Sequence, residues 1–191
     1  MNKITSVEEF TNPYTKRILG NILNQDPMAV LKSTPKRLAK AAKGLTKKQM
    51  STPPAPGKWT IAQIISHFCD AELTMSYRIR MAVAQSGANI QAYDENKWAD
   101  ALRYTGGDVH QKLETFIANR SMNVWLLSSL SSEELERFGI HEERGKETVE
   151  RMAHMLAGHD VNHVKQVEHI RSLVAVKRKA SPKRKSTRRK K

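Results

Sequence analysis

The stretch 149–174, VERMAHMLAGHDVNHVKQVEHIRSLV, predicts a long amphipathic helix, and this helix decides the fold. Its core-facing stripe advances in steps of three and four residues through Val149, Met152, Leu156, His159, His163, Gln166, Ile170 and Leu173. Two imidazoles and one amide therefore interrupt an apolar stripe near its middle. Burying a polar group without a partner costs about 1–3 kcal/mol. Because His159 and His163 are four residues apart on one face, they have the spacing that holds a divalent metal.

A third histidine, His67, replaces a core residue in another predicted helix. That helix begins near Thr60, and its stripe contains Ile64, His67, Ala71, Thr74, Arg78 and Met81. Histidine pairs four residues apart also arise by chance, so this third imidazole is what favours a metal site over two core histidines. Three histidine ligands leave coordination positions for water or substrate, as in open sites. His67, His159 and His163 are therefore the candidate metal ligands.

The other histidines are predicted to lie outside this site. His154 and His169 are rotated off the inward face of their helix, so both should face solvent. His110 lies in the first turn of a predicted helix and should also be exposed. His141 precedes the last helix and could reach the mouth of the bundle, but it is kept outside the ligand set.

Further polar residues share the histidine stripes and are candidates for lining a pocket. Gln166, one turn beyond His163, could hold a ligand water. Thr74 and Arg78 follow His67 along its stripe, and Arg78 would suit an anionic group. A hydrogen-bonded core amide and an arginine at the bundle edge are equally compatible with Gln166 and Arg78.

Four long amphipathic segments and no alternating strand pattern predict an all-α fold, a four-helix bundle. The predicted helices cover 28–43, 60–85, 108–130 and 149–174. The connection 86–106 is about twenty residues long, which suits a crossover between the second and third helices. It contains aromatic residues that could form a lid: Tyr93, Trp98 and Tyr104, beside Asp94. The expected organisation is an N-terminal extension over 1–27, the bundle over 28–174 and a disordered basic tail over 175–191. The extension should contain a short helix near 14–24.

Local signals mark the helix ends and two interruptions. The expected capping residues are Thr60, Asp108 and Thr148. Pro35 in the first helix predicts a kink, or two shorter helices separated at Thr34. Arg120 falls on the inward side of the third helix, where it could extend to an edge or pair with an acidic residue inside.

Composition narrows the class of protein. A chain of 191 residues suffices for a single core with tails. The single cysteine, Cys69, excludes a disulfide framework or a cysteine-based zinc site and suits a reducing cytoplasm. Cys69 should be a small core residue pointing away from the metal face. The sequence has no signal segment and no membrane-spanning apolar run, so we expect a cytoplasmic protein.

The net charge of +14 is concentrated at the C-terminus. Residues 177–191 contain ten Lys or Arg and no acid, and without them 23 basic residues face 19 acidic ones. Such a run repels itself and is predicted to be disordered. It could bind nucleic acid weakly and without sequence preference, or it could be a solvated terminus with no partner.

Several short motifs occur together in a characteristic order: PGKW at 56–59, SHFCDAE at 66–72, YDENKW at 93–98, GKETV at 145–149 and GHDVNHVKQ at 158–166. With these motifs the sequence resembles the DinB-like (YfiT) superfamily over roughly residues 30–174. The resemblance implies a four-helix bundle with a long crossover and a divalent metal held by His67, His159 and His163. It also implies a homodimer. Members include transferases that use low-molecular-weight thiols, a thiol-dependent isomerase, hydrolases and proteins of unknown activity.

Two functional hypotheses follow from these observations. The first is a divalent-metal-binding protein that acts on a small-molecule substrate as a metal-dependent thiol transferase or hydrolase. Its cofactors would be Zn, Ni, Fe or Mn and a low-molecular-weight thiol. No catalytic side chain is assigned, because the sequence offers no placed Ser–His or Cys–His pair. The alternative is a noncatalytic, stress-related binding protein whose basic tail contacts nucleic acid.

Overall fold

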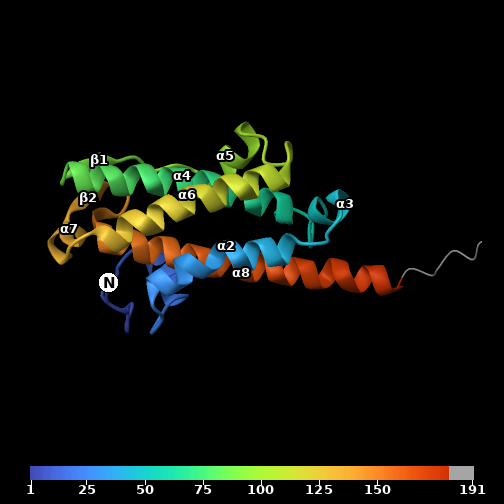
Figure 1. The fold of residues 1–191 in the computed structure, drawn as a ribbon, viewed down its shortest axis with the longest axis horizontal. Coiled ribbons are helices and arrows are strands. Elements are labelled where there is room, and N and C mark those ends of the chain that lie inside the picture. The colour runs from blue at the N-terminus through green and yellow to red at the C-terminus, as the bar shows by residue number, and fades with distance from the viewer. Residues whose placement is uncertain (181–191) are drawn as a thin grey trace, which may run out of the picture.

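A computed structural model of the chain describes residues 1–180, with the backbone alone described over 175–180, and it confirms the predicted four-helix bundle (Figure 1). The bundle helices are α2 (Pro27–Ala42), α4 (Ile61–Ala84), α6 (Val109–Ser129) and α8 (Val149–Ala180). Each helix contacts two neighbours, so that α2, α8, α4 and α6 form a closed ring around the core. Within residues 1–180, none of the helices combines the length and apolar character needed to cross a lipid bilayer.

The crossover between the second and third bundle helices is also confirmed. In Figure 1, α4 and α6 both run from right to left, whereas α2 and α8 run from left to right. Two parallel neighbours need a connection that returns along the bundle, and this one contains β1 (Ala88–Ile90) and α5 (Glu95–Ala101). Tyr93 stacks on Trp98 within it, with ring centroids 4.2 Å apart.

The predicted capping residues begin their helices as expected. Thr60 forms a reciprocal capping box with Gln63, and Asp108 accepts a hydrogen bond from the backbone N–H of His110. The hydroxyl of Thr148 accepts from the backbone N–H of Arg151 at 3.1 Å. These side chains satisfy N–H groups that have no partner inside the helix.

Helix α2 is continuous through Pro35, so the predicted division at Thr34 is wrong. A proline inside a helix leaves the carbonyl four residues earlier without its N–H donor. Here that carbonyl belongs to Leu31, and Arg120 Nη1 donates to it at 3.3 Å. The neighbouring helix α6 therefore supplies the hydrogen bond that the proline removes.

The structure contains a small sheet that the sequence pattern did not predict. Strand β2 (Phe138–His141) lies between β1 and β3 (Gly145–Thr148), parallel to β1 and antiparallel to β3. Strands of three or four residues are too short to show an alternating pattern. Gly139 is required in β2, because a Cβ there would overlap the side chain of Ile90.

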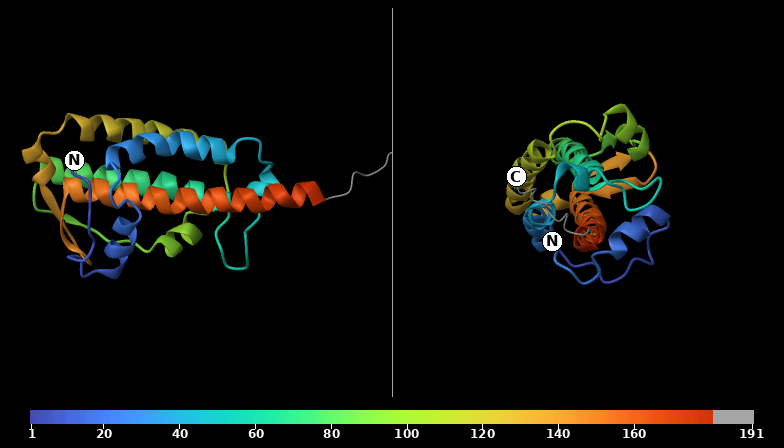
Figure 2. Two further views of the ribbon diagram at one scale, coloured as in Figure 1. Left: turned by 90° about the horizontal axis from the view of Figure 1, so that it is seen from below. Right: turned by 90° about the vertical axis from the view of Figure 1, so that its right-hand side faces the viewer.

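The remaining helices are short: α1 (Pro13–Gly20), α3 (Lys47–Met50) and α7 (Ser132–Glu136). Helix α1 lies against α8 at Gly158, where a Cβ would overlap the backbone of Ile18. The N-terminal extension is therefore packed onto the bundle. The end-on view in Figure 2 shows α1, the strands and α5 on one side of the four helices.

Helix α8 is described as far as Ala180, so it extends past the predicted end near Val174. The rest of the predicted disordered tail, 181–191, lies outside the described residues.

The buried apolar residues form two clusters, one toward each end of the bundle. The first contains residues from α1, the start of α8 and the end of α4, such as Ile18, Leu156 and Ile79. The second contains the start of α4 and the later part of α8, such as Phe68 and Val164. On α8, His159 and His163 lie between Leu156 of the first cluster and Val164 of the second. Phe68 of the second cluster contacts the rings of both histidines.

Candidate metal centre

Helices α4 and α8 bring His67, His159 and His163 together. Their ring centroids lie 4.4 to 4.9 Å apart, and one ligand nitrogen from each ring lies within 4.8 Å of the others. His67 and His159 are buried, whereas His163 is partly accessible. The predicted convergence of the three imidazoles is therefore what the fold produces.

Two of the three imidazoles are held in the neutral form that a metal requires. Burial, followed by the proximity of His159 and His163, lowers the pKa of His67 to about 2. Burial and the nearby His159 lower the pKa of His163 to about 3. At neutral pH both rings therefore keep a free nitrogen lone pair, which is the form that binds divalent cations.

The hydrogen bonding among these rings is incomplete. The Nε2 atoms of His67 and His159 are 2.8 Å apart, and two neutral imidazoles in this position share one proton. The Nδ1 atoms of both rings are buried without any partner among the described residues. Buried polar atoms are nearly always hydrogen-bonded. The unpartnered nitrogens therefore indicate that the two rings are positioned to bind a group from outside the chain.

A divalent cation fits this donor set. It would take the Nε2 lone pairs that now compete for a single proton, and each Nδ1 would then carry a hydrogen. The carboxylate of Asp160 lies 3.9 Å from Nδ1 of His159, on the side where that hydrogen would point. Partners of this kind orient the histidine ligands of metal sites.

Gln166 sets the orientation of the third ring. Its Oε1 accepts a hydrogen bond from Nδ1 of His163 at 3.0 Å, so Nε2 of His163 is the unprotonated nitrogen. Gln166 is exposed, one turn beyond His163 on α8. It contacts His163 directly through this hydrogen bond and also lines the second cavity, and its role in holding a ligand water stays a prediction.

Behind the histidines lies a buried ion-pair network. Arg120 is 1% exposed and donates to Glu72 at 2.6 and 2.9 Å, and also to Asp160. Asn123 donates to Glu72 at 2.7 Å. Burial alone would raise the pKa of Asp160, but the guanidinium of Arg120 holds it below its ordinary value. Of the two predicted roles for Arg120, pairing with an acidic residue inside is the one the structure contains.

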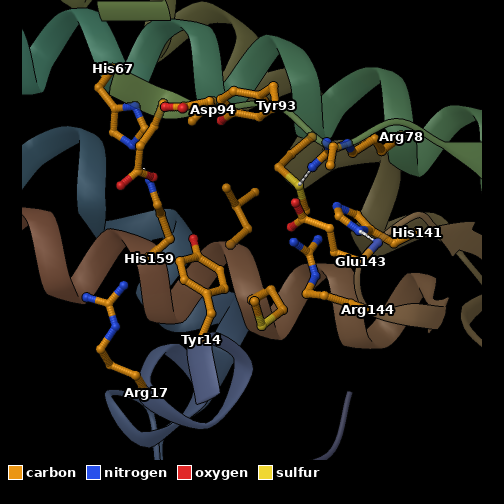
Figure 3. A pocket seen from close by; sticks show the side chains of 16 residues that line it. Tyr14, Arg17, His67, Arg78, Tyr93, Asp94, His141, Glu143, Arg144 and His159 are labelled. Atoms are coloured by element: carbon orange, nitrogen blue, oxygen red, sulfur yellow. Dashed lines mark hydrogen bonds between the residues drawn. The ribbon is translucent and has the colours of Figure 1, made fainter. Parts of the chain in front are cut away.

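A cavity of about 320 Å³, the first cavity, opens from the histidines between α4 and α8. His67 and His159 line one end of it, and Arg78, His141 and Arg144 line the other (Figure 3). Tyr14 from α1 and Tyr93 from the crossover extend into the space between these ends. Burial raises the pKa of Tyr93 to about 12, so its hydroxyl stays protonated at neutral pH.

A second cavity of about 590 Å³ lies on the other side of His163. Its lining is largely apolar and includes Trp59, Ile64, Ile170 and Leu173, with Gln166 and His163 among the polar residues. Glu95 at the start of α5 contributes to both cavities. The three histidines therefore stand between two cavities, with His67 and His159 lining the first and His163 lining the second.

The family model described as DinB superfamily matches residues 31–167, most of the chain. This chain belongs to the DinB superfamily. Helix α1 lies before the matched segment, whereas all three histidines lie within it.

Relatives of this DinB-superfamily protein carry names that mention a metal. A protein of Bacillus cereus (strain 03BB102), named "putative metal-dependent hydrolase", is 27% identical over 162 residues, which are 85% of this chain and 90% of that protein. A relative from Bacillus thuringiensis subsp. konkukian has the same identity and coverage and the same description. The solved structure of YfiT from Bacillus subtilis, described as "a probable metal-dependent hydrolase with an unusual four-helix bundle topology", superposes with a TM-score of 0.73 at 21% identity. It covers 78% of this chain and 86% of that one.

The other site predictions for this DinB-superfamily protein have mixed outcomes. Arg78 lines the first cavity, and His141 reaches it from β2. Thr74 lines neither of the two cavities, and its hydroxyl donates to the Asp70 carbonyl at 2.8 Å. The prediction that His154 faces solvent is wrong: it is 5% exposed, because the N-terminal segment covers it and the carbonyl of Asn2 lies 2.7 Å from its Nε2. His110 and His169 are exposed as expected.

The sequence did not indicate several residues of the first cavity, among them two from α1 and one from the β2–β3 turn. Tyr14 and Arg17 come from α1, and Arg144 comes from the turn between β2 and β3. Their only signal was a polar or aromatic side chain in a short segment of unassigned packing. Cys69 is half-buried rather than fully in the core, and burial raises the pKa of its thiol.

Proposed function

We propose that this protein is a metal-dependent hydrolase whose small-molecule substrate binds in the first cavity. The observation that carries the proposal is the convergence of three imidazoles, two of them held neutral by burial, at the wall of an open cavity. Zn, Ni, Fe or Mn held there would act as a Lewis acid, polarising a substrate oxygen and lowering the pKa of a nucleophile. The names of the two Bacillus relatives support the same class of reaction.

The residues around the site have separate tasks in this proposal. His67, His159 and His163 hold the cation, and Gln166 keeps Nε2 of His163 unprotonated. Tyr93, which stacks on Trp98 in the crossover, forms part of the cavity wall beside the substrate. Cys69 is excluded as the nucleophile, because burial raises the pKa of its thiol and disfavours the thiolate.

Thiol transfer is the second candidate, and the second cavity is the observation that favours it. A transferase must bring two reactants to one centre from different directions. His163 and Gln166 line the second cavity, whereas His67 and His159 line the first. An electrophilic acceptor with an apolar body would suit the space beside Trp59 and Leu173, opposite a polar thiol in the first cavity.

One experiment separates the two reactions. Purified protein is stripped with chelator, reloaded with each of the four metals, and assayed on simple esters and amides with and without a low-molecular-weight thiol. Hydrolysis requires turnover without thiol, whereas transfer requires the thiol and consumes it stoichiometrically. His163→Ala should abolish turnover, and His110→Ala, at an exposed position of α6 that lines neither cavity, should not. Turnover that survives His163→Ala would overturn both candidates.

A further inference from the structure

Arg78 is a buried charge without an acidic partner. It is 7% exposed, and no carboxylate among the described residues forms an ion pair with it. Its guanidinium donates to the Gln91 carbonyl and contacts the sulfur of Met75 at 3.9 Å. Charged side chains are almost never buried to this extent unless they are paired. The remaining N–H groups of Arg78 are therefore available to an anion from outside the chain.

The neighbouring charges do not neutralise Arg78. Arg144 lines the same end of the first cavity, but its guanidinium is already paired with Glu147 through bonds of 2.7 and 2.9 Å. Glu143 also lines the cavity, yet it is exposed and forms no ion pair with Arg78. The ring of Tyr93 lies under Arg78 at 5.5 Å, which orients the guanidinium without supplying a negative charge.

His141 supplies a second donor at the same end. It is 2% exposed, and its Nδ1 accepts a hydrogen bond from the backbone N–H of Glu143 at 3.1 Å. A neutral imidazole that accepts through Nδ1 carries its proton on Nε2. That Nε2 has no hydrogen-bond partner among residues 1–180, and the ring lines the first cavity beside Arg78 (Figure 3).

We infer that the end of the first cavity distant from the histidines binds an anionic oxygen group of the substrate, a carboxylate or a phosphate, through Arg78 and His141. This inference rests on the proposed function, because it places the reacting bond at the histidines. Arg78 and His67 are eleven residues apart in α4, about 16 Å of helix axis. The substrate is therefore an extended molecule whose anionic group lies well away from the bond that reacts.

The test measures anion binding directly and needs no turnover. Metal-free protein is titrated separately with acetate and with inorganic phosphate, while the ring C–H resonances of His141 are followed by NMR. A saturable shift with one of the two anions is expected, and the anion that binds more tightly identifies the group. Arg78→Gln should weaken that binding by about tenfold or more, because the charge-assisted hydrogen bonds are lost. Arg78→Lys, which keeps the charge, should retain part of it.

The matched control is Arg37→Gln, which removes an arginine on the bundle surface that is paired with Glu168. It should bind the anion like the unaltered protein. Equal affinities for Arg78→Gln and Arg37→Gln, or no saturable shift with either anion, would overturn the inference. Thermal unfolding of each variant checks that it is folded. If Arg78→Gln does not fold, Arg78→Lys is compared with Arg37→Gln in its place. Because the titration uses metal-free protein, its result does not decide the hydrolase proposal, which the turnover assay tests separately.

Discussion

Two buried polar clusters lie side by side in this bundle, and they differ in how completely their atoms are partnered. In the Arg120 network, Arg120 donates to Glu72, Asp160 and the Leu31 carbonyl, and Asn123 completes Glu72. In the histidine cluster next to it, two Nδ1 atoms have no partner and two Nε2 atoms compete for one proton. The first cluster is complete by itself, whereas the second is complete only with a ligand.

The difference separates stability from function by a physical criterion. Burial alone does not distinguish the clusters, since Arg120 and His67 are both 1% exposed. What distinguishes them is the number of polar atoms left unsatisfied, each of which costs free energy unless something binds there. We therefore expect substitutions in the network to change the free energy of unfolding, and substitutions in the histidine cluster to change ligand binding.

The largest effect is expected in the network. Arg120→Met would leave the carboxylates of Glu72 and Asp160 buried without a cation and should lower the free energy of unfolding by about 3–5 kcal/mol. Urea denaturation measures this change. Arg80→Gln is the control, because Arg80 is exposed and reaches the network only through Asn123. If the two variants had the same free energy of unfolding, the Arg120 network would not be what stabilises the fold.

Metal binding should depend on the histidine cluster and not on burial alone. His159→Ala removes a proposed ligand and should weaken divalent-metal affinity by more than about 100-fold, since even changes to the partners of ligands cost 10–100-fold. His154→Ala is the matched control, because His154 is also buried in α8 and bonds to the backbone. Elemental analysis measures the metal content of the two variants. Equal loss of metal in both would show that disturbing any buried histidine of α8 is enough to lose the metal.

The metal-free protein should lose stability as the pH falls below about 6.5, the ordinary histidine value. In the unfolded chain His67 and His163 take up protons there, whereas burial holds their pKa in the folded chain at about 2 and about 3. This contribution is complete above pH 6.5 and decreases by up to about 1.4 kcal/mol per pH unit for each histidine. His67→Gln should flatten the pH dependence of unfolding. Parallel curves for the two proteins would show that His67 is not held neutral.

The smallest effect should come from Gln166. Gln166→Leu removes the acceptor for Nδ1 of His163 and should lower metal affinity by about tenfold. Gln166→Glu keeps an acceptor oxygen and should bind metal at least as well as the unaltered protein. Competition with a chelator of known affinity measures both. Similar losses in the two variants would mean that the size of the side chain matters and the hydrogen bond does not.

The sequence was sufficient for the bundle and the histidines because both depend on periodicity within a single helix. Steps of three and four residues place His159 and His163 on one face of α8 whatever packs against it. The pairing of Arg120 could be stated only as an alternative, because Glu72 and Asp160 lie on two other helices. Periodicity shows that a residue points inward and not which residue it meets.

The errors arose where distant segments meet. His154 is off the core-facing stripe, but residues before α1 cover it, and no local pattern announces such a cover. The strands that place His141 and Arg144 beside the first cavity are too short to be recognised. For Pro35 the sequence left a kink and a break as alternatives, because the hydrogen bond that compensates for the proline comes from Arg120 on another helix.

The close contact at Gly158 makes one wall of the first cavity depend on a helix that precedes the four-helix bundle. It seats α1, which carries Tyr14 and Arg17 and lies outside the segment that the family model matches. The three histidines and part of the wall of the first cavity therefore come from separate segments of the chain. A single methyl group at position 158 would displace that wall without touching a ligand. A change in α1 would therefore alter the wall of the first cavity while leaving the three histidines in place.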